Sequence, residues 1–123
     1  MTENRSVLVV EDDPEINELV GAYCQIAGFD YQHASTGASA LEQAHATPPT
    51  LIVLDLMLPD TDGFEVCRQL KHDPQTRHIP VLMLTALEGD EERQKAQSCG
   101  ISAYLTKPFN PDHLMHALQH HAR

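Results

Sequence analysis

The sequence predicts an α/β fold in which helices cover both faces of a parallel sheet. Short apolar runs that suit buried strands alternate five times with segments of helical periodicity along the 123 residues. The run at 51–54, LIVL, is apolar at every position, which is typical of a strand buried on both faces. Right-handed crossovers and polar strands at the edges favour the flavodoxin-like, doubly wound order 2-1-3-4-5.

The first half of the chain supplies three strands and two helices. A valine-rich strand is expected at 6–10, and Pro14 suits the first turn of a helix over 14–26. Alternation of apolar and polar residues predicts a half-exposed strand at 29–33. A helix at 38–46 and the apolar strand at 51–54 follow.

The second half completes the alternation. A helix from residue 64 to about 72 is followed by a buried strand at 79–84. The helix expected at 88–98 is almost wholly polar, with Leu87, Ala96 and Cys99 as its main apolar contacts, so we expect it to be weakly anchored. A short strand at 103–105 and a closing helix at 109–121 end the pattern.

Composition limits the classes of function. One domain over residues 1–123 is expected from the length. A formal net charge of −10 argues against direct binding to nucleic acid or to an anionic membrane, and is compatible with a divalent cation. No apolar run is long enough to span a bilayer, and the start lacks a signal-peptide pattern. The three widely spaced cysteines are expected to be reduced, as in a cytoplasmic protein.

Chemically active side chains stand where the expected strands end. Glu11-Asp12-Asp13 follows the first strand, Asp55 the third, Thr85 the fourth and Lys107 the fifth. In an open α/β sheet these ends meet at the ligand-binding edge. Carboxylates crowded there favour Mg²⁺, and an oxygen nucleophile beside a metal, a hydroxyl and a lysine suits phosphoryl transfer. Taken singly, the acids could only cap helices or turns, and Lys107 could be a solvated surface charge.

Together these motifs resemble the response-regulator receiver domain of two-component signalling, a CheY-like fold. The resemblance covers essentially the whole chain. The motifs are the acidic cluster, Asp55 in DLMLPDTDG, Thr85-Ala86 and Lys107-Pro108-Phe109. It implies that the domain accepts a phosphoryl group and is not an enzyme acting on a separate substrate.

The resemblance also assigns roles to single residues. Asp55 is expected to be the phosphoacceptor. Mg²⁺ is expected on Asp13, Asp55 and the backbone carbonyl of Met57, with Asp12 holding a metal-bound water. Thr85, Ala86 and Lys107 are expected to contact the phosphoryl group, and Lys107-Pro108 is expected to be a cis bond. Thr85 and Tyr104 are expected to form the switch, although a tyrosine in an edge strand is usually packing.

The resemblance implies a histidine kinase or phosphotransfer protein as donor and a downstream effector as recipient of the signal. The responding face is expected on the fourth helix, the fifth strand and the last helix. Phosphorylation-dependent self-association stays open, but Ser102-Ala103 and His113 replace acids used in one dimerising subclass. Apolar Met57 and Leu87, at the positions that tune phosphoryl lifetime in the family, predict a long-lived phosphoryl group.

Three alternative hypotheses are a phosphorylation-independent pseudo-receiver, a phosphatase of the haloacid dehalogenase type and a flavodoxin-like cofactor binder. The phosphatase needs an acid where Met57 stands. The cofactor binder needs a phosphate-binding loop where the first acidic cluster stands. Separately, His113, His116 and His120 share one helical face, with His121 beside them. That spacing suits either a transition metal or a solvated surface.

Overall fold

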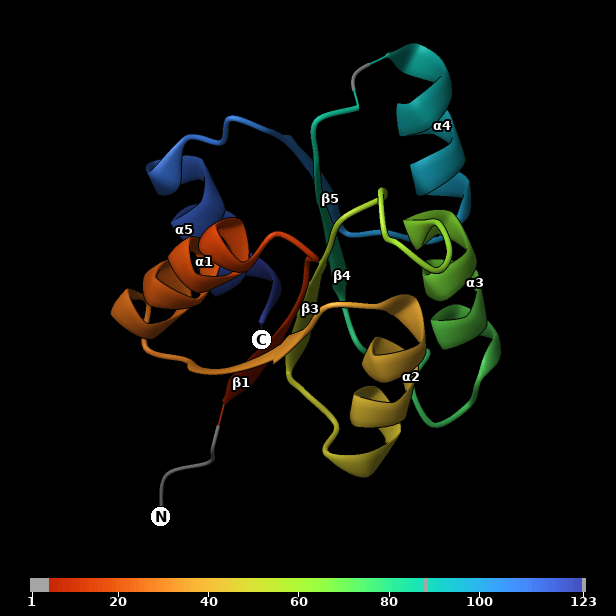
Figure 1. Ribbon diagram of the computed structural model, residues 1–123, viewed down its shortest axis with the longest axis horizontal. Coiled ribbons are helices and arrows are strands. Elements are labelled where there is room, and N and C mark those ends of the chain that lie inside the picture. Colours follow the sequence, from red (N-terminus) through yellow and green to blue (C-terminus); the bar gives the residue numbers. More distant parts are fainter. Residues whose placement is uncertain (1–4, 88, 123) are drawn as a thin grey trace.

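The fold is a five-stranded parallel sheet between two helical layers, as the alternation predicts (Figure 1). The computed structural model describes residues 5–87 and 89–122. The strands are β1 (Ser6–Val10), β2 (Asp30–Ala34), β3 (Leu51–Leu54), β4 (Val81–Thr85) and β5 (Ala103–Thr106). The helices are α1 (Pro14–Ile26), α2 (Gly37–Ala46), α3 (Gly63–His72), α4 (Asp90–Ser98) and α5 (Pro111–His121). The strand order β2-β1-β3-β4-β5 confirms the predicted topology.

The sheet divides the core into two layers. Helices α1 and α5 cover one face, and α2, α3 and α4 cover the other (Figure 1). Residues of β1 alternate between the two sides: Val7 and Val9 pack toward α1 and α5, while Leu8 and Val10 join the cluster on the opposite face. The central strand β3 is buried at every position, which is the physical reason for its uninterrupted apolar sequence.

Several element boundaries differ from the sequence expectation. β4 begins at Val81, after Pro80, and includes Thr85. α5 begins at Pro111 rather than Phe109, because the Asn110 side chain caps it by accepting the N–H groups of Asp112 and His113. α4 begins at Asp90, and the expected start at residue 88 lies outside the described residues.

Helix α4 is thinly attached, as its polar sequence predicts. Ala96 is its buried residue, and Gly89 at its N-cap has φ 141° and supplies no side-chain cap. Leu87 and Cys99 at its two ends are partly buried against the core. Among the described residues, no helix combines the length and the apolar character needed to cross a membrane.

Candidate functional site

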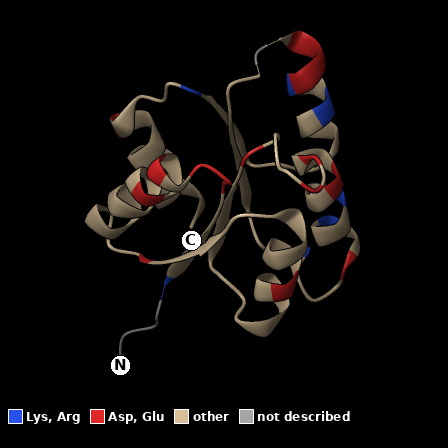
Figure 2. Ribbon diagram, viewed as in Figure 1, with Lys and Arg blue, Asp and Glu red and all other residues tan. Residues whose placement is uncertain are grey.

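Strand register brings the ends of β1 and β3 together. Val10 pairs with Leu54, and the Asp55 N–H continues the ladder by donating to the Val10 carbonyl at 3.0 Å. Glu11 and Asp55 therefore leave the sheet side by side. Figure 2 shows acidic segments after β1 and after β3 at the same edge, with a basic segment in the nearby connection after β5.

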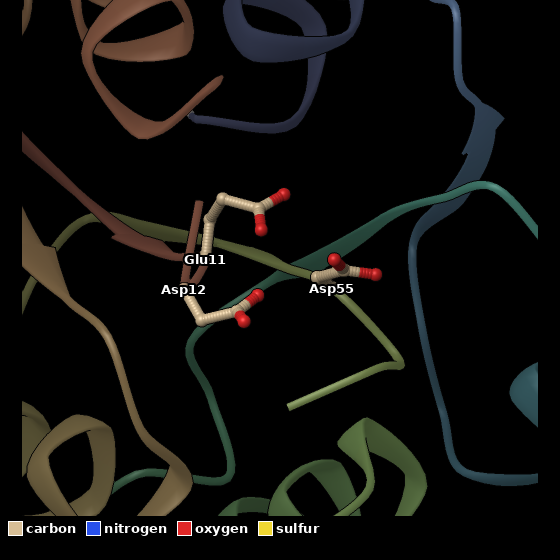
Figure 3. A group of neighbouring side chains, drawn as sticks. All are labelled: Glu11, Asp12 and Asp55. Carbon is tan, nitrogen blue, oxygen red and sulfur yellow. The ribbon is translucent and has the colours of Figure 1, made fainter. Parts of the chain in front are cut away.

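Three carboxylates form the centre of this edge. One oxygen each from Glu11, Asp12 and Asp55 lies within 4.8 Å of the others, and Figure 3 shows these side chains grouped at the two strand ends. Glu11 and Asp55 are 4% and 5% exposed, whereas Asp12 is exposed to solvent. Hard oxygen ligands at this spacing fit Mg²⁺.

Lys107 holds the buried pair of carboxylates. Its Nζ donates to Asp55 Oδ2 at 2.9 Å and to Glu11 Oε1. Its backbone N–H donates to the Thr85 carbonyl at 2.8 Å, and its bond to Pro108 is cis, as expected. Burial lowers the Lys107 pKa, but the hydrogen bonds and charges of Glu11 and Asp55 outweigh it, so the pKa lies above its ordinary value. The Lys107 amine therefore stays protonated beside the carboxyl groups of Glu11 and Asp55.

The pKa of Glu11 is also raised above its ordinary value, which in an acid favours the neutral form. Burial raises its pKa, and the hydrogen bond from Lys107 only partly opposes this. Asn17, buried on α1, fixes the backbone here: its Nδ2 donates to the Glu11 carbonyl at 2.9 Å, and its Oδ1 accepts the Tyr31 hydroxyl at 2.5 Å. The sequence interpretation gave no role to Asn17 and no separate role to Glu11.

Asp13 is not part of the carboxylate group. Its Oδ1 accepts the N–H of Glu15 at 2.9 Å and of Ile16 at 3.4 Å, so the side chain caps α1. The structure therefore shows Asp13 as the cap of α1, while the carboxylates that it groups together are those of Glu11, Asp12 and Asp55. Asp13 is the third residue after β1 and directly precedes α1, so it stands at the position where the helix needs a cap.

The backbone after β3 wraps closely around Asp55. The Met57 N–H donates to Asp55 Oδ1 at 3.2 Å, and the Met57 side chain is 59% exposed beside the site. A Cβ added to Gly63 would stand 2.5 Å from the Asp55 carbonyl oxygen. Glycine is therefore required where α3 begins against the strand end.

The other two acids of the DLMLPDTDG motif serve helices. Asp62 accepts the Glu65 N–H and caps α3. Asp60 accepts the N–H groups of Gly37 and Ala38 at the start of α2, and these bonds hold its pKa below the ordinary value. These acids position the loop that carries Met57 and lie outside the carboxylate group.

Thr85, Leu87 and Tyr104 form a connected series leading away from the site. Thr85 is fully buried at the end of β4, and its Oγ1 accepts the Leu87 N–H at 3.2 Å. The Tyr104 hydroxyl on β5 donates to the Leu87 carbonyl at 2.6 Å. The Arg93 guanidinium of α4 lies 4.7 Å from the centre of the Tyr104 ring. Ala86, between Thr85 and Leu87, is exposed.

Comparison with known proteins places these features in a family. Residues 7–119 match the model of the response regulator receiver domain. The DNA-binding dual master transcriptional regulator RpaA of Synechocystis sp. is 43% identical over 109 residues, which is 89% of this chain and 45% of that protein. The phosphate regulon transcriptional regulatory protein PhoB of Escherichia coli is 40% identical over 111 residues, 90% of this chain and 48% of that protein. The chain thus spans less than half the length of these relatives.

Solved structures agree. A putative response regulator from Chloroflexus aurantiacus is 29% identical with a TM-score of 0.92, and 98% of each chain is covered. The chemotaxis protein CheY4 of Vibrio cholerae is 32% identical with a TM-score of 0.90, covering 97% of this chain and 99% of that one. With this fold and these motifs, the chain belongs to the response regulator receiver domains of two-component signalling systems.

Proposed function

We propose that Asp55 accepts a phosphoryl group from a phosphohistidine on a histidine kinase or phosphotransfer protein. The observation that carries this proposal is the Lys107 ammonium bound to the buried Asp55 carboxylate at the edge where β1 and β3 end. A bond forms between an Asp55 carboxylate oxygen and phosphorus as the phosphorus–nitrogen bond of the donor breaks. The donor imidazole keeps the electron pair and takes up a proton.

Receiver domains typically use Mg²⁺, and the carboxylate group fits it. We assign Asp12 and Asp55 as the ligands, with the Met57 carbonyl as a further predicted ligand. Glu11 lies beside them in the position first expected for Asp12. We thereby propose Asp12 for the role first expected of Asp13, that of a direct Mg²⁺ ligand. Glu11 is proposed for the role first expected of Asp12, that of holding a metal-bound water. When bound, the ion neutralises charge on the phosphoryl oxygens.

The chain's own groups do the remaining work. Lys107 lies against Asp55 and is placed to pair with a phosphoryl oxygen, while the Ala86 N–H stays a predicted donor to another. Thr85 is proposed to turn its hydroxyl toward the phosphoryl group, which breaks its bond to Leu87. The Tyr104 hydroxyl, bonded to the Leu87 carbonyl, is then free to take a second position. The linked series of Thr85, Leu87 and Tyr104 would thus have two arrangements, one without and one with the phosphoryl group. A population shift requires two such states.

The output surface is proposed to be α4, β5 and α5. Helix α4 is thinly packed and touches the series through Arg93 and Tyr104, so it can respond at low energetic cost. The relatives include transcriptional regulators by name, and we propose that an effector on another segment or protein reads this face. The single-domain organisation over residues 1–123 stays a prediction.

Intact-mass measurement after incubation with Mg²⁺ and acetyl phosphate tests the proposal. The wild-type chain should gain the mass of one phosphoryl group, and Asp55→Asn should gain none. Asp62→Asn is the matched control, because Asp62 caps α3 and should leave phosphorylation intact. An unmodified wild-type chain would favour the pseudo-receiver reading, and phosphorylation of Asp55→Asn would remove Asp55 as the acceptor.

A further inference from the structure

Helix α5 carries a cluster of histidine side chains, remote in sequence from the acidic edge. The rings of His116 and His120 are stacked with centroids 5.9 Å apart and planes 9° from parallel. His121 meets the His120 ring edge-on at 4.8 Å. His116 and His120 are both exposed, so solvent ions reach them. Nothing in the phosphoacceptor chemistry uses these residues.

The ring geometry is within reach of a shared ion. An imidazole bound through one nitrogen has its centroid roughly 3.2 Å from a zinc ion, given a Zn–N bond of about 2.0 Å. Two rings on one ion therefore have centroids at most roughly 6.4 Å apart. The observed 5.9 Å lies inside this limit, and residues four apart on a helix lie one above the other on the same face. The separation of the two rings therefore allows one nitrogen of each to reach a shared ion.

The end of α5 that carries these rings is held in place. The Ala122 N–H donates to the Leu118 carbonyl at 3.1 Å, and Ala122 is 3% exposed. Arg5, just before β1, donates from Nη2 to the Ala122 carbonyl at 2.8 Å. The two histidines therefore stand on an ordered turn tied to the sheet, and their separation is set by the helix.

The rings also affect one another electrostatically. Burial lowers the pKa of His121, and the nearby His120 and His116 lower it further. This shift favours the neutral form of the His121 ring. Neutral imidazole is the form that binds a metal ion.

We propose that His116 and His120 chelate a divalent transition-metal ion such as Zn²⁺, Ni²⁺ or Cu²⁺, independently of the Mg²⁺ site. Imidazole nitrogens suit these ions, whereas the carboxylates near Asp55 suit Mg²⁺, so the two sites differ in ligand chemistry. Two protein ligands leave the ion's other positions to water. The bound ion links successive turns and stabilises the end of α5.

Calorimetric titration of the untagged chain with Zn²⁺, in excess Mg²⁺ at pH 7.5, tests this site. The wild type should bind one ion, and His116→Gln or His120→Gln should each weaken binding at least about tenfold, because one imidazole remains. His113→Gln is the matched control and should bind as the wild type does. Among the described ring contacts, His113 takes part in none.

Two further measurements separate the site from the acidic edge. In an Asp12→Asn background the Zn²⁺ titration should be unchanged, since Asp12 belongs to the other site. In nuclear magnetic resonance spectra, Zn²⁺ should shift the ring signals of His116 and His120 in slow or intermediate exchange. Wild-type affinity in both glutamine variants, or loss of binding in Asp12→Asn, would overturn the proposal.

Discussion

Asp12 and Asp13 are neighbouring acids with different surroundings. Asp12 lies in the carboxylate group with Asp55, whereas Asp13 accepts two backbone N–H groups at the start of α1. A cap bond of this kind stabilises a helix by about 1 kcal/mol, so the fold gives Asp13 a structural role that Asp12 does not have. The sequence pattern of three consecutive acids offered no means of telling which of them would point into the site.

Met57 is a second residue whose surroundings suggest a measurable effect. Its apolar side chain lies exposed beside Asp55, where it is placed to hinder water from reaching a phosphoryl group. Met57→Asn should shorten the phosphoryl half-life roughly three- to tenfold, the range that about 0.7 to 1.4 kcal/mol of barrier produces. Decay of the phosphorylated mass after removal of the donor measures it.

Ile26→Asn is the control for this substitution. Ile26 is 68% exposed at the end of α1, so the same apolar-to-amide change occurs there far along the chain from Asp55. Its half-life should match that of the wild type. An unchanged half-life in Met57→Asn would mean that the apolar cover does not limit hydrolysis.

At the scale of elements, a charged pair links α2 to the end of α3. His45 Nδ1 lies 2.8 Å from the Leu41 carbonyl, and its Nε2 contacts the carboxylate of Asp73, the C-cap of α3. Both ring nitrogens face acceptors, so only the protonated ring donates to both. The Leu41 bond and then the Asp73 bond raise the His45 pKa above 6.5. The Gln75 N–H and then His45 lower the Asp73 pKa below 3.8.

The pair therefore stabilises the fold within a defined pH window. The His45 contribution is complete below its ordinary pKa of 6.5 and is lost as pH rises through the higher folded-state pKa. The Asp73 contribution is present above 3.8 and is lost as pH falls through the lower folded-state pKa. Because both groups are solvent-accessible, solvent screening keeps the effect small.

We expect the difference in urea midpoint between the wild type and His45→Gln to be largest below pH 6.5 and to shrink as the pH rises through the raised folded-state pKa of His45. A nuclear magnetic resonance titration of the His45 ring supplies the matching pKa. In Asp73→Asn that pKa should fall back toward its ordinary value. A His45 pKa at or below 6.5 in the wild type would contradict the ion pair.

At the scale of the whole molecule, several carboxylates lie close together at one edge of the sheet, and their mutual repulsion destabilises the native fold. The chain carries a formal net charge of −10, and two of its carboxylates, Glu11 and Asp55, are buried together. Lys107 offsets part of this repulsion. A cation that binds the folded edge and not the unfolded chain should stabilise the protein by mass action.

Mg²⁺ at ten times its dissociation constant should stabilise the native state by about 1.4 kcal/mol. For a chain of this size that corresponds to a rise in Tm of roughly 4–8 °C, which chelation of the ion should reverse. Differential scanning calorimetry with and without Mg²⁺ measures it. Asp12→Asn should lose most of the rise.

Asp13→Asn is the matched control in the same experiment. Asparagine caps a helix about as well as aspartate, so the variant should fold and keep the Mg²⁺-dependent rise in Tm. If Asp13→Asn lost the rise and Asp12→Asn kept it, the first assignment of the metal ligands would be restored and the present one rejected.

Much of this protein was determined by local sequence. Apolar runs such as LIVL at 51–54 can satisfy their burial only inside a sheet, and the alternation with helical segments selected the parallel topology. The placement of Asp55 and Lys107 at strand ends followed from that topology. The start of α5 was missed because Asn110 competes as a cap, a choice made by backbone geometry.

Only the tertiary structure decided which acids share the site and which histidines face each other. A side chain's direction after a strand depends on how the loop turns, and that turn is set by distant partners such as Asn17 and Tyr31. The pattern of three acids was therefore enough to place a charged edge but not to choose its members. Folding made that choice, because the start of α1 required a cap and Asp13 supplied it.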